Sequence, residues 1–274
     1  MFAGAFSSAI ANLLIALLVL AGLAVYLTLI RQISTRRTTI DPAPGALPVR
    51  TFGVPEMFLA AALILFVLIN ITAAAGHSSI RLTSRDLIAN LLFTLFVVLF
   101  IAAFLKLRRI DIDTLAGFSR TSLKRAISTG IVLLLSAAPL IGLAEGITQT
   151  IFRGGSSKQE IVDLFNSSQS IQQRVAIIVL AVVVAPISEE FIFRFFIYGV
   201  LRRYLGIAIG VVFNALLFAA AHTHLPSALP LFVLGICFTL AYEWSGSILV
   251  SMTMHAVFNS TQLILLAFPD SLKQ

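Results

Sequence analysis

The chain has 274 residues, of which 59% are hydrophobic and only 11% are charged, and its mean hydropathy is +1.01. Because a soluble domain carries about 25% charged residues, these values exclude an ordinary soluble enzyme, a disordered chain and a coiled coil. The net charge of +7 is explained by positive residues in cytoplasmic loops, so no nucleic-acid partner is expected. The single cysteine, Cys237, excludes an internal disulfide and a cysteine-based zinc site.

Long apolar segments dominate the chain. A membrane-spanning helix needs about 20 mostly apolar residues, and the sequence predicts an all-α polytopic membrane protein of about eight transmembrane helices. They run roughly over 5–30, 54–77, 87–107, 126–151, 175–201, 207–224, 226–243 and 247–268. Only a tight turn around Pro226 separates the sixth span from the seventh, so seven or nine spans remain alternatives. No positive charge precedes the first span, which argues against a cleaved signal peptide.

Two connections have a recognisable character. Residues 36–53, with Pro42, Pro44, Gly45 and Pro48, predict an irregular cytoplasmic connection. Residues 156–174 place Ile161, Leu164 and Phe165 at helical spacing, which predicts an interfacial helix. We find no internal repeat, which disfavours an inverted-repeat transporter.

The positive residues set the expected orientation. Alternate loops contain twelve of them, in segments 31–53, 105–125 and 202–203, whereas the opposite set contains six. The positive-inside rule then places both termini outside and the basic loops in the cytoplasm, where segment 105–125 can contact anionic lipid head groups. The small size and short loops favour a multi-pass protein of a prokaryotic plasma membrane.

Ionisable residues inside the bilayer are costly, by about 2.5–3.5 kcal/mol each, and are therefore functional candidates. No aspartate falls within a predicted span, which excludes an intramembrane aspartyl dyad. In the fifth span Glu190 and Arg194 are four residues apart and can pair on one helix face. Glu189 points about 100° away and is free to face a cavity. Repulsion between the two carboxylates favours a proton-accepting role for one of them, and Pro186 is expected to bend this span.

Two further spans carry polar stripes with a step of four residues, and such stripes must face protein or water rather than lipid. They consist of Asn214, Phe218 and His222 in the sixth span and of Ser247, Ser251, His255 and Asn259 in the eighth. At about 1.5 Å per residue, Glu189 lies about 20 Å from the cytoplasmic end, His222 about 24 Å, His255 about 13 Å and Asn259 about 20 Å. These depths predict one hydrated cavity near or beyond the midplane.

This set of residues fits hydrolysis without a covalent intermediate. Glu189 can take a proton from water that His222 helps to position, while His255 and Asn259 can donate hydrogen bonds to the tetrahedral oxygen. The sequence lacks His-Glu-x-x-His and Gly-x-Ser-x-Gly, so the common zinc-protease helix and a serine nucleophile have no position. A zinc site built from Glu189, His222 and His255 remains an alternative, although no cofactor is expected.

Three motifs occur in order on separate late spans: Glu189-Glu190-x-x-x-Arg194, Phe218-x-x-x-His222 and His255-x-x-x-Asn259. Together they resemble the CPBP family of intramembrane proteases, which includes CAAX prenyl endopeptidases and bacteriocin-processing proteins. The resemblance implies Glu189 and His222 as the water-activating pair, His255 and Asn259 as oxyanion stabilisers, and Glu190 and Arg194 as a supporting pair. We expect the chain to divide into N-terminal accessory transmembrane helices, 1–125, and a catalytic membrane domain, 126–274, whose motifs lie within 175–266.

Other interpretations compete with the protease. The ion pair could only lock helices together, His222 could be interfacial, and His255 with Asn259 could bond neighbouring helices. Glu56, Glu145 and His224 are expected to be packing or interfacial residues. The protein itself is expected to be an intramembrane endopeptidase acting on membrane-associated peptides or proteins; the alternatives are a catalytically silent immunity or binding protein and a proton-coupled transporter.

Overall fold

The computed structural model describes residues 2–36, 52–75, 84–152 and 171–267, and every regular element in these ranges is a helix. The predicted fold class, an all-α polytopic membrane protein, is therefore confirmed. The elements are α1 Phe2–Arg36, α2 Val54–Ala75, α3 Ser84–Leu107, α4 Ile112–Ala116, α5 Leu123–Ile151, α7 Ile171–Val179, the π-helix η1 Leu180–Val184, α8 Ala185–Glu190, the π-helix η2 Phe191–Ile197, α9 Tyr198–Ala221, the 3₁₀ turn η3 Leu225–Ser227, α10 Ala228–Ser245 and α11 Ile248–Ala267.

Seven continuous helical runs in the described chain are long and apolar enough to cross a bilayer. One of them, Ile171–Ala221, has 51 residues; a straight helix of that length would measure about 77 Å, against a hydrocarbon core of about 30 Å. The run breaks at Gly206, whose φ of 82° and ψ of 173° are accessible essentially to glycine alone. A Cβ on Gly210 would lie only 3.2 Å from the backbone nitrogen of Arg202, which would be impossible in a straight helix. The chain therefore reverses direction at Gly206. The run therefore holds two spans, and the described helices match the eight that the sequence predicts.

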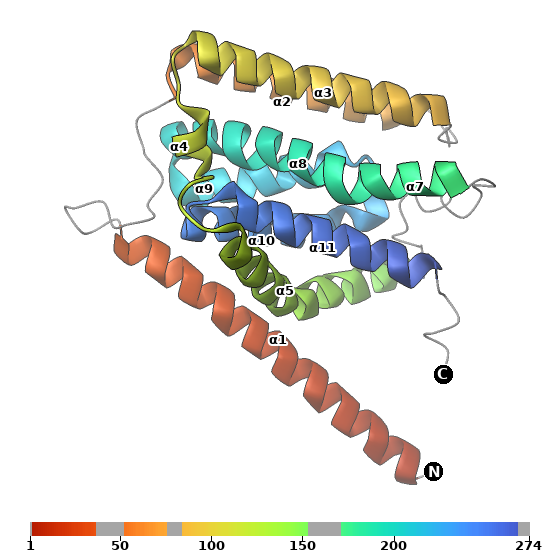
Figure 1. The fold of residues 1–274 in the computed structure, drawn as a ribbon. Helices are drawn as coiled ribbons and strands as arrows, with labels where there is room; N and C mark the ends of the chain where they lie inside the picture. Colours follow the sequence, from red (N-terminus) through yellow and green to blue (C-terminus); the bar gives the residue numbers. More distant parts are fainter. Residues whose placement is uncertain (1, 37–51, 76–83, 153–170, 268–274) are drawn as a thin grey trace.

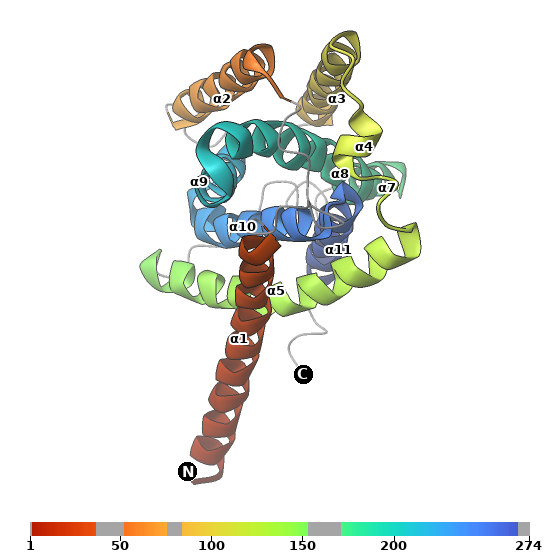
Figure 2. The same ribbon diagram turned by 90° about the vertical axis from the view of Figure 1, so that its left-hand side faces the viewer.

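The helices stack in layers around α10 (Figures 1 and 2). Helix α2 packs on α9 and α3 on α8, so these two helices cover one face of the bundle, while α10 contacts α9, α5, α11 and α1. Helix α5 closes the opposite face, and Figure 2 shows it bent near its middle, where Pro139 removes a backbone hydrogen bond. Helix α1 crosses α5 and α10, and its N-terminal half extends away from the bundle.

The segments that carry the predicted cytoplasmic charges meet at one end of the bundle, on the left of Figure 1, and we call it the basic end. There the Arg36 guanidinium donates to the Trp244 carbonyl at 2.8 Å, and the Trp244 indole N–H donates to Gln32 Oε1 at 2.6 Å. Gly117 has a φ of 71°, and a Cβ at this position would overlap the carbonyl oxygen of Gly246. The ends of α1, α4 and α10 are thus joined. The N-terminal end of α1 and the C-terminal end of α11 both lie on the opposite side, as the orientation predicts.

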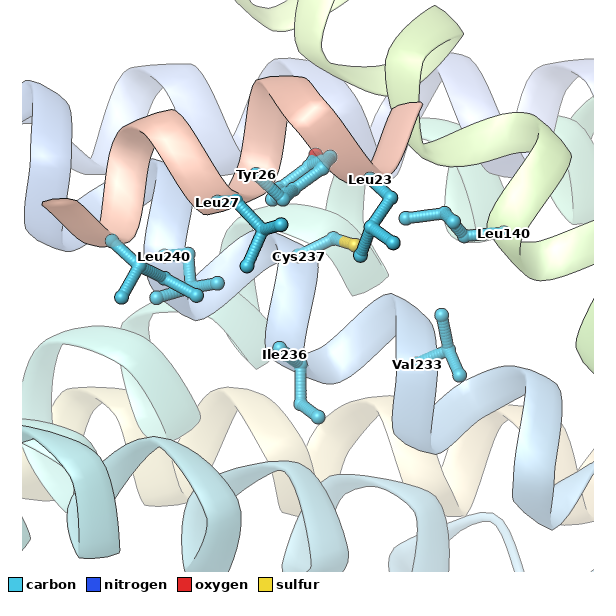
Figure 3. A pocket seen from close by; sticks show the side chains of 9 residues that line it. Leu23, Tyr26, Leu27, Leu140, Val233, Ile236, Cys237 and Leu240 are labelled. Atoms are coloured by element: carbon cyan, nitrogen blue, oxygen red, sulfur yellow. The ribbon is translucent and has the colours of Figure 1, made fainter. Parts of the chain in front are cut away.

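An apolar groove of about 170 Å³ lies between α1, α5 and α10. Figure 3 shows Leu23, Tyr26 and Leu27 of α1 facing Cys237 and Leu240 of α10. The Tyr26 hydroxyl donates to the Leu133 carbonyl at 2.9 Å, which ties α1 to α5. Cys237 is buried, as expected for a packing residue in an apolar helix.

Two predicted connections fall largely outside the described residues. The irregular connection over 36–53 is described only at its two ends. The interfacial helix predicted over 156–174 is described only from residue 171, where the chain already belongs to α7. Both stay predictions.

Candidate active site

The carboxylates lie in a segment whose helical register changes twice. The α8 turn Ala185–Glu190 is flanked by η1 and η2, in which the Ala185 N–H donates to the Leu180 carbonyl and the Tyr198 N–H to that of Phe193, both five residues back. Pro186 has no N–H to give to the Ala181 carbonyl in this register. Pro186 thus lies next to a π-helical turn, a feature that often marks functional sites. The bend predicted at Pro186 stays a prediction.

Glu190 and Arg194 form a buried ion pair. Glu190 Oε1 lies 3.0 Å from Arg194 Nη1, and both side chains are 0% exposed. Within the described chain none of the three guanidinium nitrogens makes a hydrogen bond. Instead the guanidinium carbon lies 4.0 Å from the ring centre of Phe218 and 5.1 Å from that of Phe238. Pairing and the faces of two rings together compensate the buried positive charge.

His255 joins this pair to Glu189. Its Nδ1 lies 2.9 Å from Glu190 Oε1, and its Nε2 lies 3.9 Å from Glu189 Oε2. Since an ionised carboxylate only accepts hydrogen bonds, Nδ1 carries the proton in this contact. The imidazole is therefore oriented by Glu190, with its second nitrogen facing the other carboxylate.

His222 approaches Glu189 from α9. Its Nδ1 lies 2.8 Å from the Phe218 carbonyl oxygen, which can only accept, so Nδ1 is again the donor. Its Nε2 then faces Glu189 Oε2 at 3.9 Å. The side chains of Glu189 and His222 are 26% and 21% exposed, whereas that of His255 is 4% exposed. One carboxylate oxygen thus faces two imidazole nitrogens across gaps that suit a bridging water better than a direct bond.

Phe218 lies at the centre of this cluster. Besides Arg194, its ring makes edge-on contacts with His222 at 4.8 Å and with His255 at 5.8 Å between ring centres. Phe238 packs against His255 at 5.1 Å. The sequence motif includes Phe218 but gives no reason for it, and Phe238 was not predicted. The structure shows the role of both rings: together they pack against the Arg194 guanidinium and the two imidazoles.

Asn259, predicted as an oxyanion donor, hydrogen-bonds to the protein backbone. Its amide nitrogen donates to the Ala181 carbonyl at 2.7 Å, the carbonyl that Pro186 and the π-register leave without a helical partner. This bond joins α11 to η1 and fixes the amide plane. An amide nitrogen has two hydrogens, so one remains to donate elsewhere.

Several other polar residues are structural. The Asn214 amide donates to Thr239 Oγ1 at 3.0 Å and binds α9 to α10, while Ser251 returns its hydroxyl to the Ile248 carbonyl. His224 contacts Ser227, as expected for a residue at the turn. Glu56 is fully buried and pairs with Arg108 at 3.1 Å, and Glu145 accepts from Gln149. These contacts agree with the packing roles predicted for Glu56, Glu145 and His224.

The sequence did not single out Glu243, a further buried acid. Glu243 accepts a hydrogen bond from the Tyr198 hydroxyl at 2.8 Å and pairs with Arg202 at 2.9 Å. Its signal was a lone carboxylate in the last turn of an apolar span. The partner was hidden because Arg202 looked like an ordinary cytoplasmic charge, and the ion pair forms only where α9 packs against α10.

The side chains around Glu189 are of types that also bind metals. Two imidazole nitrogens and one carboxylate oxygen are a known ligand set for catalytic zinc, and both nitrogens face the same oxygen. Glu190 would support His255 from behind, as a carboxylate commonly does for a zinc-bound histidine. The residue types thus match a zinc ligand set, although within the described residues no group of three His, Cys, Asp or Glu side chains is placed so that it could hold a metal ion.

Comparisons with known proteins address the same part of the chain. Residues 171–261 match the family model described as Type II CAAX prenyl endopeptidase Rce1-like. The chain is 30% identical over 99 residues to the membrane-embedded CAAX protease MroQ of Staphylococcus aureus (strain USA300), covering 34% of this chain and 40% of that protein. It is 25% identical over 173 residues to the "Putative membrane peptidase YdiL" of Bacillus subtilis (strain 168), covering 62% and 68%.

No solved structure matches the chain. The match to the family model begins at the first described residue of α7 and ends two residues after Asn259, so it contains all three motifs. The matched range agrees with segment 175–266, which the sequence predicts to contain the motifs. The resemblance predicted from those motifs is therefore confirmed: residues 171–261 are similar to the family described as Type II CAAX prenyl endopeptidase Rce1-like.

Proposed function

We propose that this protein is an intramembrane endopeptidase that hydrolyses peptide bonds of membrane-associated peptides or proteins with water activated by Glu189 and His222. One observation carries the proposal: Glu189 Oε2 faces two imidazole nitrogens at 3.9 Å, while the adjacent Glu190 is occupied by Arg194 and His255. Two neighbouring carboxylates thus have separate roles, one in charge balance and one available for chemistry. The matched family and the two bacterial relatives support peptidase activity.

The reaction follows from the orientation of the three side chains. A water between Glu189 and His222 gives a proton to the carboxylate as its oxygen attacks the carbonyl carbon of the substrate. The His222 Nε2 lone pair accepts the second hydrogen of that water and holds it in line. When the tetrahedral intermediate collapses, the proton held by Glu189 passes to the leaving amine nitrogen, so the carboxylate is regenerated.

The developing oxyanion needs donors, and His255 and Asn259 are the candidates. In its imidazolium form His255 keeps Nδ1–H on Glu190 and presents Nε2–H to the site. The charges of Glu189, Glu190, Arg194 and His255 then sum to zero, which suits a low-dielectric interior. Asn259, held by Ala181 through one hydrogen, offers the other. Removal of one such donor typically lowers kcat by about 10²–10³-fold.

Zinc is the alternative to a water activated by glutamate alone. Glu189, His222 and His255 would hold the ion, and the ion would polarise the carbonyl and lower the pKa of bound water. Metal analysis of active protein before and after chelation separates the two chemistries. Stoichiometric zinc whose removal abolishes cleavage would replace the metal-free mechanism.

The test of the function uses purified protein in detergent and a panel of fluorogenic peptides. Replacement of Glu189 by Ala should lower kcat by about 10²–10⁴-fold, the usual contribution of general base catalysis, with little change in the thermal midpoint. Glu145→Ala is the matched control, because Glu145 is a carboxylate on a different membrane-spanning helix, α5, where it accepts a hydrogen bond from Gln149. Equal cleavage by wild type and Glu189→Ala would reject the assignment.

The same panel separates the competing functions. A catalytically silent immunity or binding protein would leave every peptide intact, and a proton-coupled transporter would instead move protons in liposomes in a Glu189-dependent way. The division into accessory helices 1–125 and a catalytic domain 126–274 belongs to this proposal, as does a location in a prokaryotic plasma membrane. The bacterial relatives support that location.

A further inference from the structure

Charge is distributed unequally between the two ends of the bundle. Ten described positive residues lie at the basic end, at the ends of α1 and α3, around α4 and before Gly206, against four acidic ones, Glu56, Asp111, Asp113 and Glu243. At the opposite end the described chain has two positive residues, Arg85 and Arg174, and two acidic ones, Asp86 and Glu145. Within the described residues the excess is therefore six at one end and zero at the other. By the positive-inside rule the basic end is cytoplasmic.

The catalytic cluster is closed toward that basic end. The polar side chains between the cluster and the basic end are 0% exposed, and they come from all four helices that frame it: Arg194, Asn214, Thr239, Ser247 and Ser251. The bond from Asn214 to Thr239 closes the space between α9 and α10. Neither water nor a peptide can reach Glu189 from this side without opening the packed core.

Within the described residues the cluster is open toward the other end. Exposure begins at Glu189 and His222, whose side chains are 26% and 21% exposed, and reaches 69% at Leu225. His222 is the C-cap of α9, so α9 itself does not continue past it. On α11 the fully buried Ser251 gives way to a partly exposed Asn259 along the same face. Within the described chain, access therefore runs from the end whose described residues carry no excess positive charge.

We propose that the active site is reached from the extracytoplasmic side and that its substrates are peptides or proteins whose cleaved segment lies in the outer half of the membrane. The proposal rests on the proposed function, but its evidence is separate: charge fixes which end is inside, and burial fixes which end is open. The substrate class is thus one that has already been inserted or translocated, rather than a cytoplasmic protein tail.

Cysteine labelling tests the orientation without any substrate. Cys237 is the one cysteine of the chain, so Cys237→Ser gives a blank background. Leu225→Cys and Leu107→Cys then form a matched pair, because the two leucines are 69% and 85% exposed and lie at opposite ends. We expect a membrane-impermeant maleimide to label Leu225→Cys in intact cells and Leu107→Cys only after permeabilisation. The reverse pattern, or labelling of both from outside, overturns the proposal.

Oriented vesicles test the access itself. A charged, impermeant fluorogenic peptide that the detergent-solubilised protein cleaves should be cut by right-side-out vesicles, and cleavage should be lost in inverted vesicles until detergent opens them. Cleavage by inverted vesicles only would overturn the outer access while leaving the endopeptidase intact. Absence of Glu189-dependent cleavage even in detergent would instead reject the proposed function, and the labelling result would still decide the orientation.

Discussion

Helices α2 and α3 and helix α10 are all apolar, yet they differ sharply in what they contact. The α2 and α3 spans have mean hydropathies of 2.3 and 2.7, and 11% of each is buried in the protein. The span Leu225–Ser245, which contains α10, has a lower mean hydropathy of 1.8, and 61% of it is buried. In a membrane the most hydrophobic segments face lipid, and the protein core is where polar residues can be satisfied. The least apolar of these three spans is thus the one that packs inside the bundle, where Phe238 of α10 contacts Arg194 and His255.

The largest effect should come from breaking charge balance in the core. Arg194→Met leaves Glu190 buried without its counter-charge, so the free energy of unfolding should fall by about 3–5 kcal/mol. The fluorescence of the single tryptophan, Trp244, can follow unfolding in detergent. Glu190→Gln combined with Arg194→Met removes both charges and should recover much of the loss. A double variant no more stable than Arg194→Met alone would contradict the pair as the source of the penalty.

A smaller effect is expected from the aromatic support of that cation. Phe218→Leu removes the ring 4.0 Å from the Arg194 guanidinium and should cost about 2 kcal/mol of stability, the size of a desolvated cation–π contact. It should also lower kcat more than it changes KM, because both imidazoles lose a neighbour. Phe213→Leu is the control, since Phe213 is on the same helix but 51% exposed. Equal losses in the two variants would show that the ring acts only as bulk.

The smallest effect tests the comparison directly. Leu99→Ala on α3 removes a side chain that is 66% exposed and should change stability by less than about 0.5 kcal/mol, with activity preserved. Leu234→Ala on α10 removes one that is 1% exposed and should cost about 2–5 kcal/mol. A large loss of activity in Leu99→Ala would show that α3 contributes to substrate handling and not only to lipid contact.

The sequence predicted the parts of the site that depend on spacing along one helix. The four-residue step from Glu190 to Arg194 predicted their ion pair, and the offset of Glu189 predicted that it would be free of that pair. Likewise the eight spans could be located, because each is a long apolar segment. Helical spacing and the length of an apolar segment are local properties, so they do not depend on which helices pack together.

The sequence could not predict the contacts that depend on which helices pack against each other. The bond from Asn259 to Ala181 requires a carbonyl freed by the π-helical register, and hydrophobic pattern does not distinguish that register from an α-helix. The contact of His255 with Glu190, and that of Arg202 with Glu243, join segments far apart in the chain. His255 was predicted as an oxyanion donor, a role that stays a prediction, while its orientation by Glu190 appeared only in the fold.

The placement of Glu190 and Arg194 on a single helix also bears on how the protein is made. Two partners one turn apart can neutralise each other while the segment is still entering the bilayer, before any later helix has been synthesised. The nascent fifth span then carries Glu189 as its one uncompensated acid, until α9 and α11 arrive with their imidazoles. Biogenesis therefore meets one unpaired charge in this segment rather than three, which keeps the segment within what hydrophobic insertion can tolerate.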